Sequence, residues 1–229
     1  MLMPYSLYIH LIMGAYQNMS GLYPDLIEKA KAYGYPSSSI CILEGDEKKL
    51  QRDFPDAYNN LMSCNHHRDR RTPMEYGRDL VASWLFEDYL MEHLQAEGIS
   101  VSSAGADKNR EVLPNAKVSS YSDCLVRYDG RERLLELMSD YTGYWARYKK
   151  MELRDSKYTK MQESKSLFLG VSTVDQKYIL LDMSEVFDFT FIPAYFLYGG
   201  KPAYSIKLSR DRLRDLDFRD IAEDIKRMI

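Results

Sequence analysis

The segment TPMEYGRDLVASWLFEDYLMEHLQAEG, residues 72–98, constrains the fold of this chain more than any other feature. Thr72 can cap a helix, Pro73 suits the first helical position, and Glu75 completes a capping box. Gly98 provides a stop signal at the other end. The pattern predicts one long helix, which must bury its apolar residues against another element.

Strand-like segments follow this helix, and some are joined by tight turns such as YGGK, whose glycines permit the positive φ angles of a hairpin. The order of helices, strands and a final helix predicts an α/β fold of the mixed α+β kind, with a central mixed sheet flanked by helices. The expected strands are ISVSSA (99–104), SDCLVRY (122–128), ERLLELM (132–138), LFLGVST (167–173), KYILLDM (177–183), FTFIPAYFLY (189–198) and AYSIKL (203–208).

The chain divides by pattern into residues 1–71 and residues 72–229. The first stretch reads as short helices joined by turns, a mostly helical N-terminal extension. The second contains the long helix, the strands, a C-terminal hairpin and a last helix that Asp217 can cap. The two stretches can also form one compact domain.

Composition limits the partners and the compartment. The net charge is −3, so the chain has no overall basic field for nucleic acid, and a polyanion site must be a local patch. Cys41, Cys64 and Cys124 form no CxxC pair, which favours a reducing compartment and a cytoplasmic location. The apolar opening, MLMPYSLYIHLIMGAY, is too short to span a membrane and predicts a buried helix or strand, with no membrane partner.

Two carboxylates occur in neighbouring predicted strands. Asp123 stands at the start of one and Glu136 lies inside the apolar run of the next, and a turn at YDGRE would bring them to one face of the sheet. Clustered carboxylates repel each other unless a cation lies between them, and their hard oxygens favour Mg²⁺ or Mn²⁺. Such an ion can activate water and neutralise charge on a phosphoryl group.

Glu87 is a third candidate ligand, on the same helical stripe as Leu80, Trp84, Met91 and Leu94. A carboxylate on a core-facing stripe is costly unless it has a partner. Either Glu87 lies at the edge of the stripe and reaches water, or it points into a polar site under the helix.

This order, in which a helix with a glutamate precedes a strand with aspartate and a strand reading Glu-Leu-Met, is similar to that of the PD-(D/E)XK, or restriction-endonuclease-like, nucleases. The resemblance covers residues 75–183 and implies a nuclease core in residues 72–229. It also implies that Asp123, Glu136 and Glu87 are metal-binding and catalytic residues, with Mg²⁺ or Mn²⁺ as cofactor.

Met138 departs from the family pattern, which has lysine at this position, and serine precedes Asp123 where the family has proline. The family's lysine orients or deprotonates the attacking water and stabilises the charged transition state, and a thioether does neither. The basic run that follows offers replacements: Lys157 is the first candidate for a relocated catalytic lysine, with Lys150 behind it.

The same run, YWARYKKMELRDSKYTKMQESK, interleaves aromatic residues with cations. Cations can bind phosphates and aromatic rings can stack on unpaired bases. The alternative is a solvated charged face whose aromatic residues pack on the core. The expected nucleic-acid contacts are Lys149, Lys150, Arg154, Lys157 and Lys160.

Three functions fit these patterns. The first is a Mg²⁺-dependent endo- or exodeoxyribonuclease, with DNA as the expected nucleic acid and a homodimer as a candidate assembly. The second is an inactive nuclease-fold module that binds nucleic acid or protein. In the third, an unrelated interaction protein, both carboxylates are ordinary strand-end residues.

The motif CNHHRDRR, residues 64–71, lacks the spacing of a metal site and predicts a polar loop.

Overall fold

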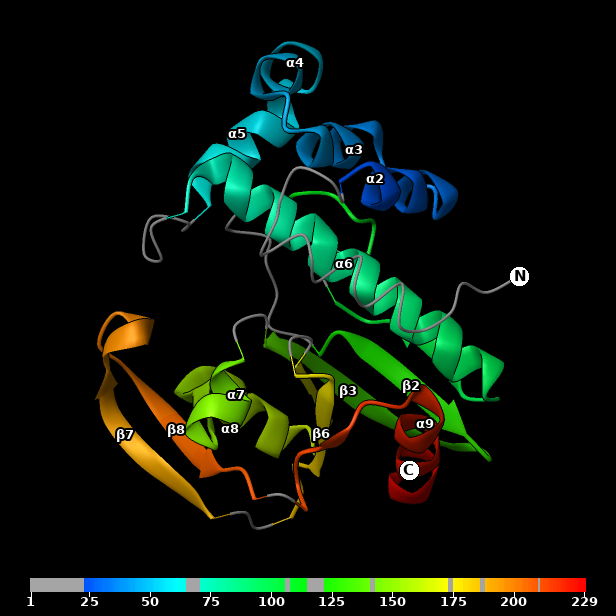
Figure 1. The fold of residues 1–229 in the computed structure, drawn as a ribbon, viewed down its shortest axis with the longest axis vertical. Coiled ribbons are helices and arrows are strands. Elements are labelled where there is room, and N and C mark those ends of the chain that lie inside the picture. The colour runs from blue at the N-terminus through cyan, green and yellow to red at the C-terminus, as the bar shows by residue number, and fades with distance from the viewer. Residues whose placement is uncertain are drawn as a thin grey trace. The chain divides into compact units, whose positions relative to one another are not determined.

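The computed structural model describes residues 23–64, 71–105, 108–114, 122–140, 143–172, 175–185, 188–209 and 211–229. The apolar opening and most of CNHHRDRR therefore lie outside the described residues. The chain forms two compact units: unit 1 is residues 1–89 and 106–119, and unit 2 is residues 90–105 and 120–229 (Figure 1). The division between residues 71 and 72 stays a prediction.

Unit 1 is helical in its described part. Its helices are α2 (Tyr23–Ala32), α3 (Ser37–Glu44), α4 (Glu47–Asp53), α5 (Pro55–Ser63) and the first part of α6 (Pro73–Ala96). Their inward faces supply buried residues such as Ile42, Leu50 and Leu61. Short helices are what the sequence predicts for this region, although the apolar run within SSSICILE is itself a helix.

The capping box of α6 is confirmed. The Thr72 amide donates to Glu75 Oε2 at 2.7 Å, and the Glu75 amide donates to Thr72 Oγ1 at 3.2 Å. The apolar stripe is wider than predicted, because Leu85 and Phe86 are buried beside Trp84.

Unit 2 contains the central mixed sheet that the sequence predicts. It is ordered β1-β2-β3-β5-β6-β9, and β3 and β5 are parallel while the other pairs are antiparallel. Asp129 and Gly130 form the β2–β3 turn with φ angles of 50° and 73°. The strands are β1 (Ser100–Ser103), β2 (Cys124–Tyr128), β3 (Arg131–Asp140), β5 (Leu167–Ser172), β6 (Lys177–Asp182) and β9 (Arg214–Asp215).

A second sheet, ordered β4-β8-β7, is not predicted by the sequence. The C-terminal hairpin joins this sheet instead of extending the central one. The basic run that precedes it folds as helix, strand and helix. The elements are α7 (Tyr144–Tyr148), β4 (Lys150–Arg154), α8 (Asp155–Glu163), β7 (Phe189–Tyr195), the short 3-10 helix η3 (Phe196–Tyr198) and β8 (Lys201–Lys207).

The two sheets of unit 2 share one apolar cluster. Phe168 and Ile179 from the central sheet meet Met151 and Ile206 from the second sheet, and Trp145 lies among them. The last helix, α9 (Phe218–Met228), begins at Asp217, whose side chain accepts from the amides of residues 219 and 220. Among the described helices, none has the length and apolar character needed to cross a membrane.

Candidate active site

The β2–β3 hairpin places Asp123 beside Glu136. Cys124 pairs with Leu135 at the end of the ladder, so Asp123 stands one register step further on, opposite Glu136. The Asp123 side chain folds onto β3, where its Oδ2 accepts from the Leu137 amide at 2.7 Å. Its backbone carbonyl accepts from the amides of Ala104 and Gly105 at 2.9 and 3.2 Å. Asp123 is therefore held by both its main chain and its side chain.

Glu136 is buried, with only 6% of its surface exposed. A buried carboxylate needs a charged or hydrogen-bonded partner. Lys157, in the first turn of α8, supplies it, because its Nζ lies 2.5 Å from Glu136 Oε1. The two side chains differ in exposure: that of Lys157 is 36% exposed, and that of Glu136 is 9% exposed. One end of the ion pair therefore faces solvent.

The field at Lys157 comes from both carboxylates. Burial disfavours its charged form, but attraction to Glu136 and then to Asp123 outweighs burial and raises the pKa of Lys157. Arg154 acts in the opposite direction, as a like charge nearby. Lys157 is therefore an ammonium ion at neutral pH. Asp123, Glu136 and Lys157 thus form a group of two acids and one cation, which we call the carboxylate–lysine site.

Met138 lies on the same face of β3 as Glu136, since residues two apart on a strand point the same way. It is half-buried, stands opposite Gly170 of β5, and packs against the apolar cluster shared by the two sheets. The space at this position of β3 is thus filled by apolar packing.

Glu87, the third predicted ligand, belongs to unit 1. Its Oε2 accepts from Arg110 Nη1 at 2.7 Å, and its side chain is only 13% exposed. Asp88 binds the same guanidinium. Glu87 therefore has a buried cationic partner, and its role as a metal ligand stays a prediction. Within the described residues, no group of three or more His, Cys, Asp or Glu side chains is arranged to hold a metal ion.

Lys150, the second candidate lysine, has a carboxylate partner of its own. Its Nζ lies 2.8 Å from Oε1 of Glu152, a buried residue of β4. The same oxygen accepts from the Tyr144 hydroxyl at 3.0 Å. Hydrogen bonds of Lys150 with Glu152 and with Tyr144 raise the pKa of Lys150. The sequence analysis did not single out Glu152, although an acid between Met151 and Leu153 in KMELR was a visible signal.

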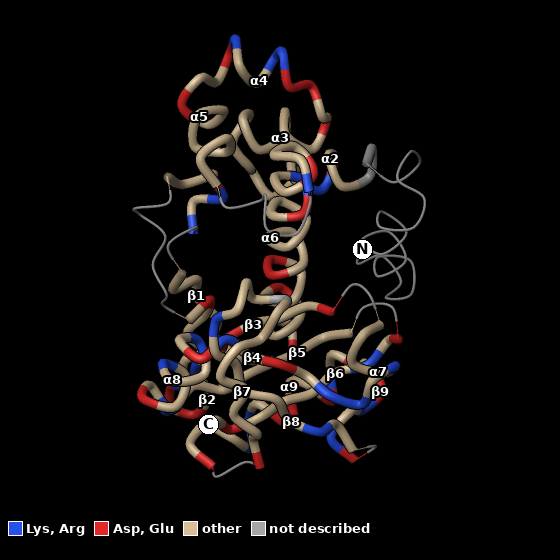
Figure 2. Tube along the Cα trace, turned by 90° about the vertical axis from the view of Figure 1, so that its left-hand side faces the viewer, with Lys and Arg blue, Asp and Glu red and all other residues tan. Residues whose placement is uncertain are grey.

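The other predicted nucleic-acid contacts are dispersed. Lys149 is exposed with a φ of 52°, and the Arg154 guanidinium lies 5.1 Å from the centre of the Tyr198 ring. Lys160 is one helical turn beyond Lys157 on α8. Acidic and basic residues alternate along both units (Figure 2). The role of these cations in binding stays a prediction.

Some aromatic residues of the basic run pack on the core, and others are exposed to solvent. Trp145 is 4% exposed and belongs to the apolar cluster, whereas Tyr148 is 54% exposed. Tyr158 is half-buried and stacks on Tyr204 with ring centres 4.0 Å apart.

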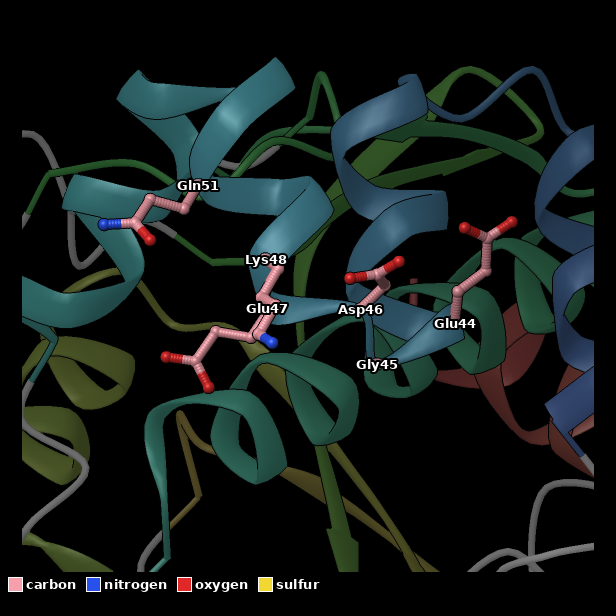
Figure 3. Close-up of a pocket in the computed structure, with 6 residues that line it drawn as sticks. All are labelled: Glu44, Gly45, Asp46, Glu47, Lys48 and Gln51. Atoms are coloured by element: carbon pink, nitrogen blue, oxygen red, sulfur yellow. The ribbon is translucent and has the colours of Figure 1, made fainter.

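Unit 1 has a hollow of its own at the turn between α3 and α4 (Figure 3). Two of its three acidic side chains have structural partners: Asp46 accepts from the Lys49 amide at 2.9 Å, and Glu44 binds the Lys49 ammonium at 2.9 Å. Asp46 is thus the N-cap of α4. Its lining residues are Glu44, Gly45, Asp46, Glu47, Lys48 and Gln51.

No family model and no curated protein sequence matches this chain. The carboxylate–lysine site must therefore be interpreted from its own chemistry.

Proposed function

We propose that this protein is a metal-dependent nuclease that hydrolyses phosphodiester bonds in DNA. In this proposal Asp123 and Glu136 hold the ion, and Lys157 takes the place of the lysine that Met138 replaces. The observation that carries the proposal is the 2.5 Å contact between Lys157 Nζ and Glu136 Oε1. A lysine 21 residues beyond the glutamate, on a different element, thereby lies in the field of both acids.

The donor set suits a hard divalent cation. Mg²⁺ in phosphoryl-transfer sites is commonly held by one or two carboxylates, with water and substrate phosphates completing the coordination. When bound, Mg²⁺ or Mn²⁺ would neutralise phosphoryl charge and favour an attacking water. Asp123 and Glu136 would hold it, and the hydrogen bond from Leu137 would keep Asp123 oriented.

Lys157 acts as a cation in this proposal. Because its pKa is raised, it keeps its proton at neutral pH and cannot serve as a base in the metal-free protein. Its charge offsets the repulsion between the two acids and favours the negative charge that develops on the phosphoryl group.

Metal binding tests the proposal without relying on cleavage. We expect titration with Mn²⁺, followed by calorimetry, to show binding that Asp123→Asn and Glu136→Gln each weaken by at least tenfold, because each removes one charged ligand. Glu132→Gln is the matched control, since Glu132 lies on the same strand but is exposed. Equal Mn²⁺ affinity in all four proteins would overturn the assignment of these ligands.

The second candidate function is a binding module without catalysis. Two observations favour it: Met138 packs on the apolar cluster, and Glu136 already has an ion-pair partner. This module would bind nucleic acid or protein but would release no cleaved product with any divalent cation.

A further inference from the structure

A row of aromatic rings runs from α8 to the second sheet. Tyr158 follows Lys157 directly on α8 and stacks on Tyr204 of β8, with ring centres 4.0 Å apart and planes 24° apart. Phe191 of β7 continues the row, 5.3 Å from Tyr204. Helix α8 packs against β8, so the row joins three elements of unit 2 (Figure 1). We call it the aromatic row (Tyr158, Tyr204, Phe191).

The outer end of the aromatic row is open. Phe191 is 51% exposed although its ring lies near that of Tyr204. The inner end is half-buried beside Phe189, whose ring centre is 4.8 Å from that of Tyr158. The inner end of the row, Tyr158, is thus fixed by packing, and the ring of Phe191 at the outer end is accessible to a ligand.

Cations accompany the row along α8. Lys160 follows Lys157 by three residues, on the same flank of the helix. A ligand seated on the rings would therefore carry negative charge beside Lys157 and an unsaturated planar group over Phe191.

We propose that the aromatic row stacks an unpaired nucleobase and directs a single strand toward Lys157. This inference rests on the proposed function and names its substrate class: nucleic acid with an unpaired strand. Aromatic rings and cations together bind single strands, whereas in a duplex the faces of the bases are already covered by their neighbours. A protein partner would instead need a broad apolar surface, and the neighbours of Lys157 on this flank are charged.

The test is fluorescence anisotropy in EDTA, with a labelled poly-dT single strand and a labelled blunt hairpin duplex. We expect Phe191→Ala to weaken single-strand binding by roughly 5- to 150-fold, as removal of one stacked base does, and to leave duplex binding unchanged. Phe191→Leu should lose the same affinity, and Phe191→Tyr should retain it, because only the ring can stack.

Phe196→Ala is the matched control, since Phe196 is 79% exposed and packs on Tyr195 outside the aromatic row. Its single-strand affinity should equal that of the unaltered protein. The inference is overturned if Phe191→Ala changes nothing, if it weakens both probes equally, or if Phe191→Leu retains binding as an apolar contact would. It is also overturned if Phe191→Ala dissociates a dimer in sedimentation, because the row would then be an interface between copies.

The inference and the proposed function fail separately. Single-strand binding that depends on Phe191, with no cleavage under Mg²⁺ or Mn²⁺, would support the row and reject the nuclease. Cleavage that depends on Glu136, with equal affinity for both probes, would support the nuclease and reject the row.

Discussion

At the scale of single residues, Glu136 and Lys157 form one ion pair in unit 2. A carboxylate in a poorly solvated position is destabilising when its partner is removed, and costs of about 3–5 kcal/mol are typical for fully buried pairs. The Lys157 side chain is 36% exposed, so water can replace part of the interaction. The stability of unit 2 and the chemistry proposed for it therefore share one ion pair.

The first prediction concerns stability. Lys157→Met should lower the free energy of unfolding by about 1–3 kcal/mol, because it leaves Glu136 without a cation. Adding Glu136→Gln should recover most of this loss, since the double variant buries no unpaired charge. Urea denaturation measures both. A double variant no more stable than Lys157→Met would mean that the ion pair contributes little.

The second prediction exchanges the positions of the lysine and the methionine. Lys157→Met should reduce Mg²⁺-dependent cleavage by about 10²–10³-fold, the usual effect of losing one preorganised charge contact. Met138→Lys in the same protein should restore part of the rate, because residue 138 lies on the face of β3 that carries Glu136. A folded exchange variant, checked by circular dichroism, that stays as inactive as Lys157→Met would show that residue 138 does not reach the site.

At the scale of helices and strands, Gly170 lets α7 pack closely on the central sheet. A Cβ atom at this residue of β5 would lie 2.7 and 2.8 Å from atoms of the Trp145 ring, and 2.9 Å from Ile179 Cγ2. These distances are below normal contact, and the atoms belong to the packed cluster. The absence of a side chain is therefore what lets the Trp145 ring pack on the sheet.

The third prediction follows from that contact. Gly170→Ala should lower the free energy of unfolding by about 1–3 kcal/mol through overpacking. Thr190→Ala, a change at an exposed position of β7, is the control and should stay within about 0.5 kcal/mol of the unaltered protein. Thermal melting that finds Gly170→Ala unchanged would mean that Trp145 can move aside at no cost.

The elements that the sequence predicted are those with a local signature. The capping box of Thr72 and Glu75 and the glycine turns each depend on residues close in sequence. Strand β4 was not predicted although KMELR alternates polar and apolar residues, because it is only five residues long and lies inside the basic run. Its pairing with β8 joins residues about 50 positions apart, as Met151 with Ile206, and no local pattern encodes that contact.

The candidate site was predictable to a similar extent. Asp123 and Glu136 could be placed together because a short hairpin fixes their register. Lys157 could be named as a cation but not located, since its position depends on how α8 packs. Tyr204 and Phe191 carried no signal, because their rings meet Tyr158 only through the second sheet.

At the scale of the whole molecule, Arg133 connects distant parts of unit 2. Its guanidinium donates to Asp182 of β6 at 2.7 and 3.0 Å and to the Met228 carbonyl of α9 at 3.1 Å. Burial disfavours the charged carboxylate, but the bonds from Arg133 and Ser184 outweigh burial and lower the pKa of Asp182 from 3.8 to about 2.

The fourth prediction is the resulting acid sensitivity. Because the pKa of Asp182 is lower in the folded protein than in the unfolded chain, its contribution is complete above about pH 4 and is lost as pH falls through about 2. Asp182→Asn should remove about 1–2 kcal/mol of stability at pH 7 and flatten the decline between pH 4 and 2. Asp129→Asn, at the exposed β2–β3 turn, is the control. Parallel stability curves for Asp182→Asn and the unaltered protein would contradict the assignment.

Cleavage of a labelled single-stranded DNA, measured with Mg²⁺ and again with EDTA, tests the central claim most directly. We predict products with Mg²⁺ and none with EDTA, no products from Glu136→Gln, and a loss of about 10²–10³-fold in rate for Lys157→Met. Lys207→Met, a change at an exposed position of β8, should stay within a few-fold of the unaltered protein. Cleavage that persists in EDTA or in Glu136→Gln, or no cleavage by the unaltered protein with either Mg²⁺ or Mn²⁺, would contradict the assignment of Asp123, Glu136 and Lys157 as a nuclease site.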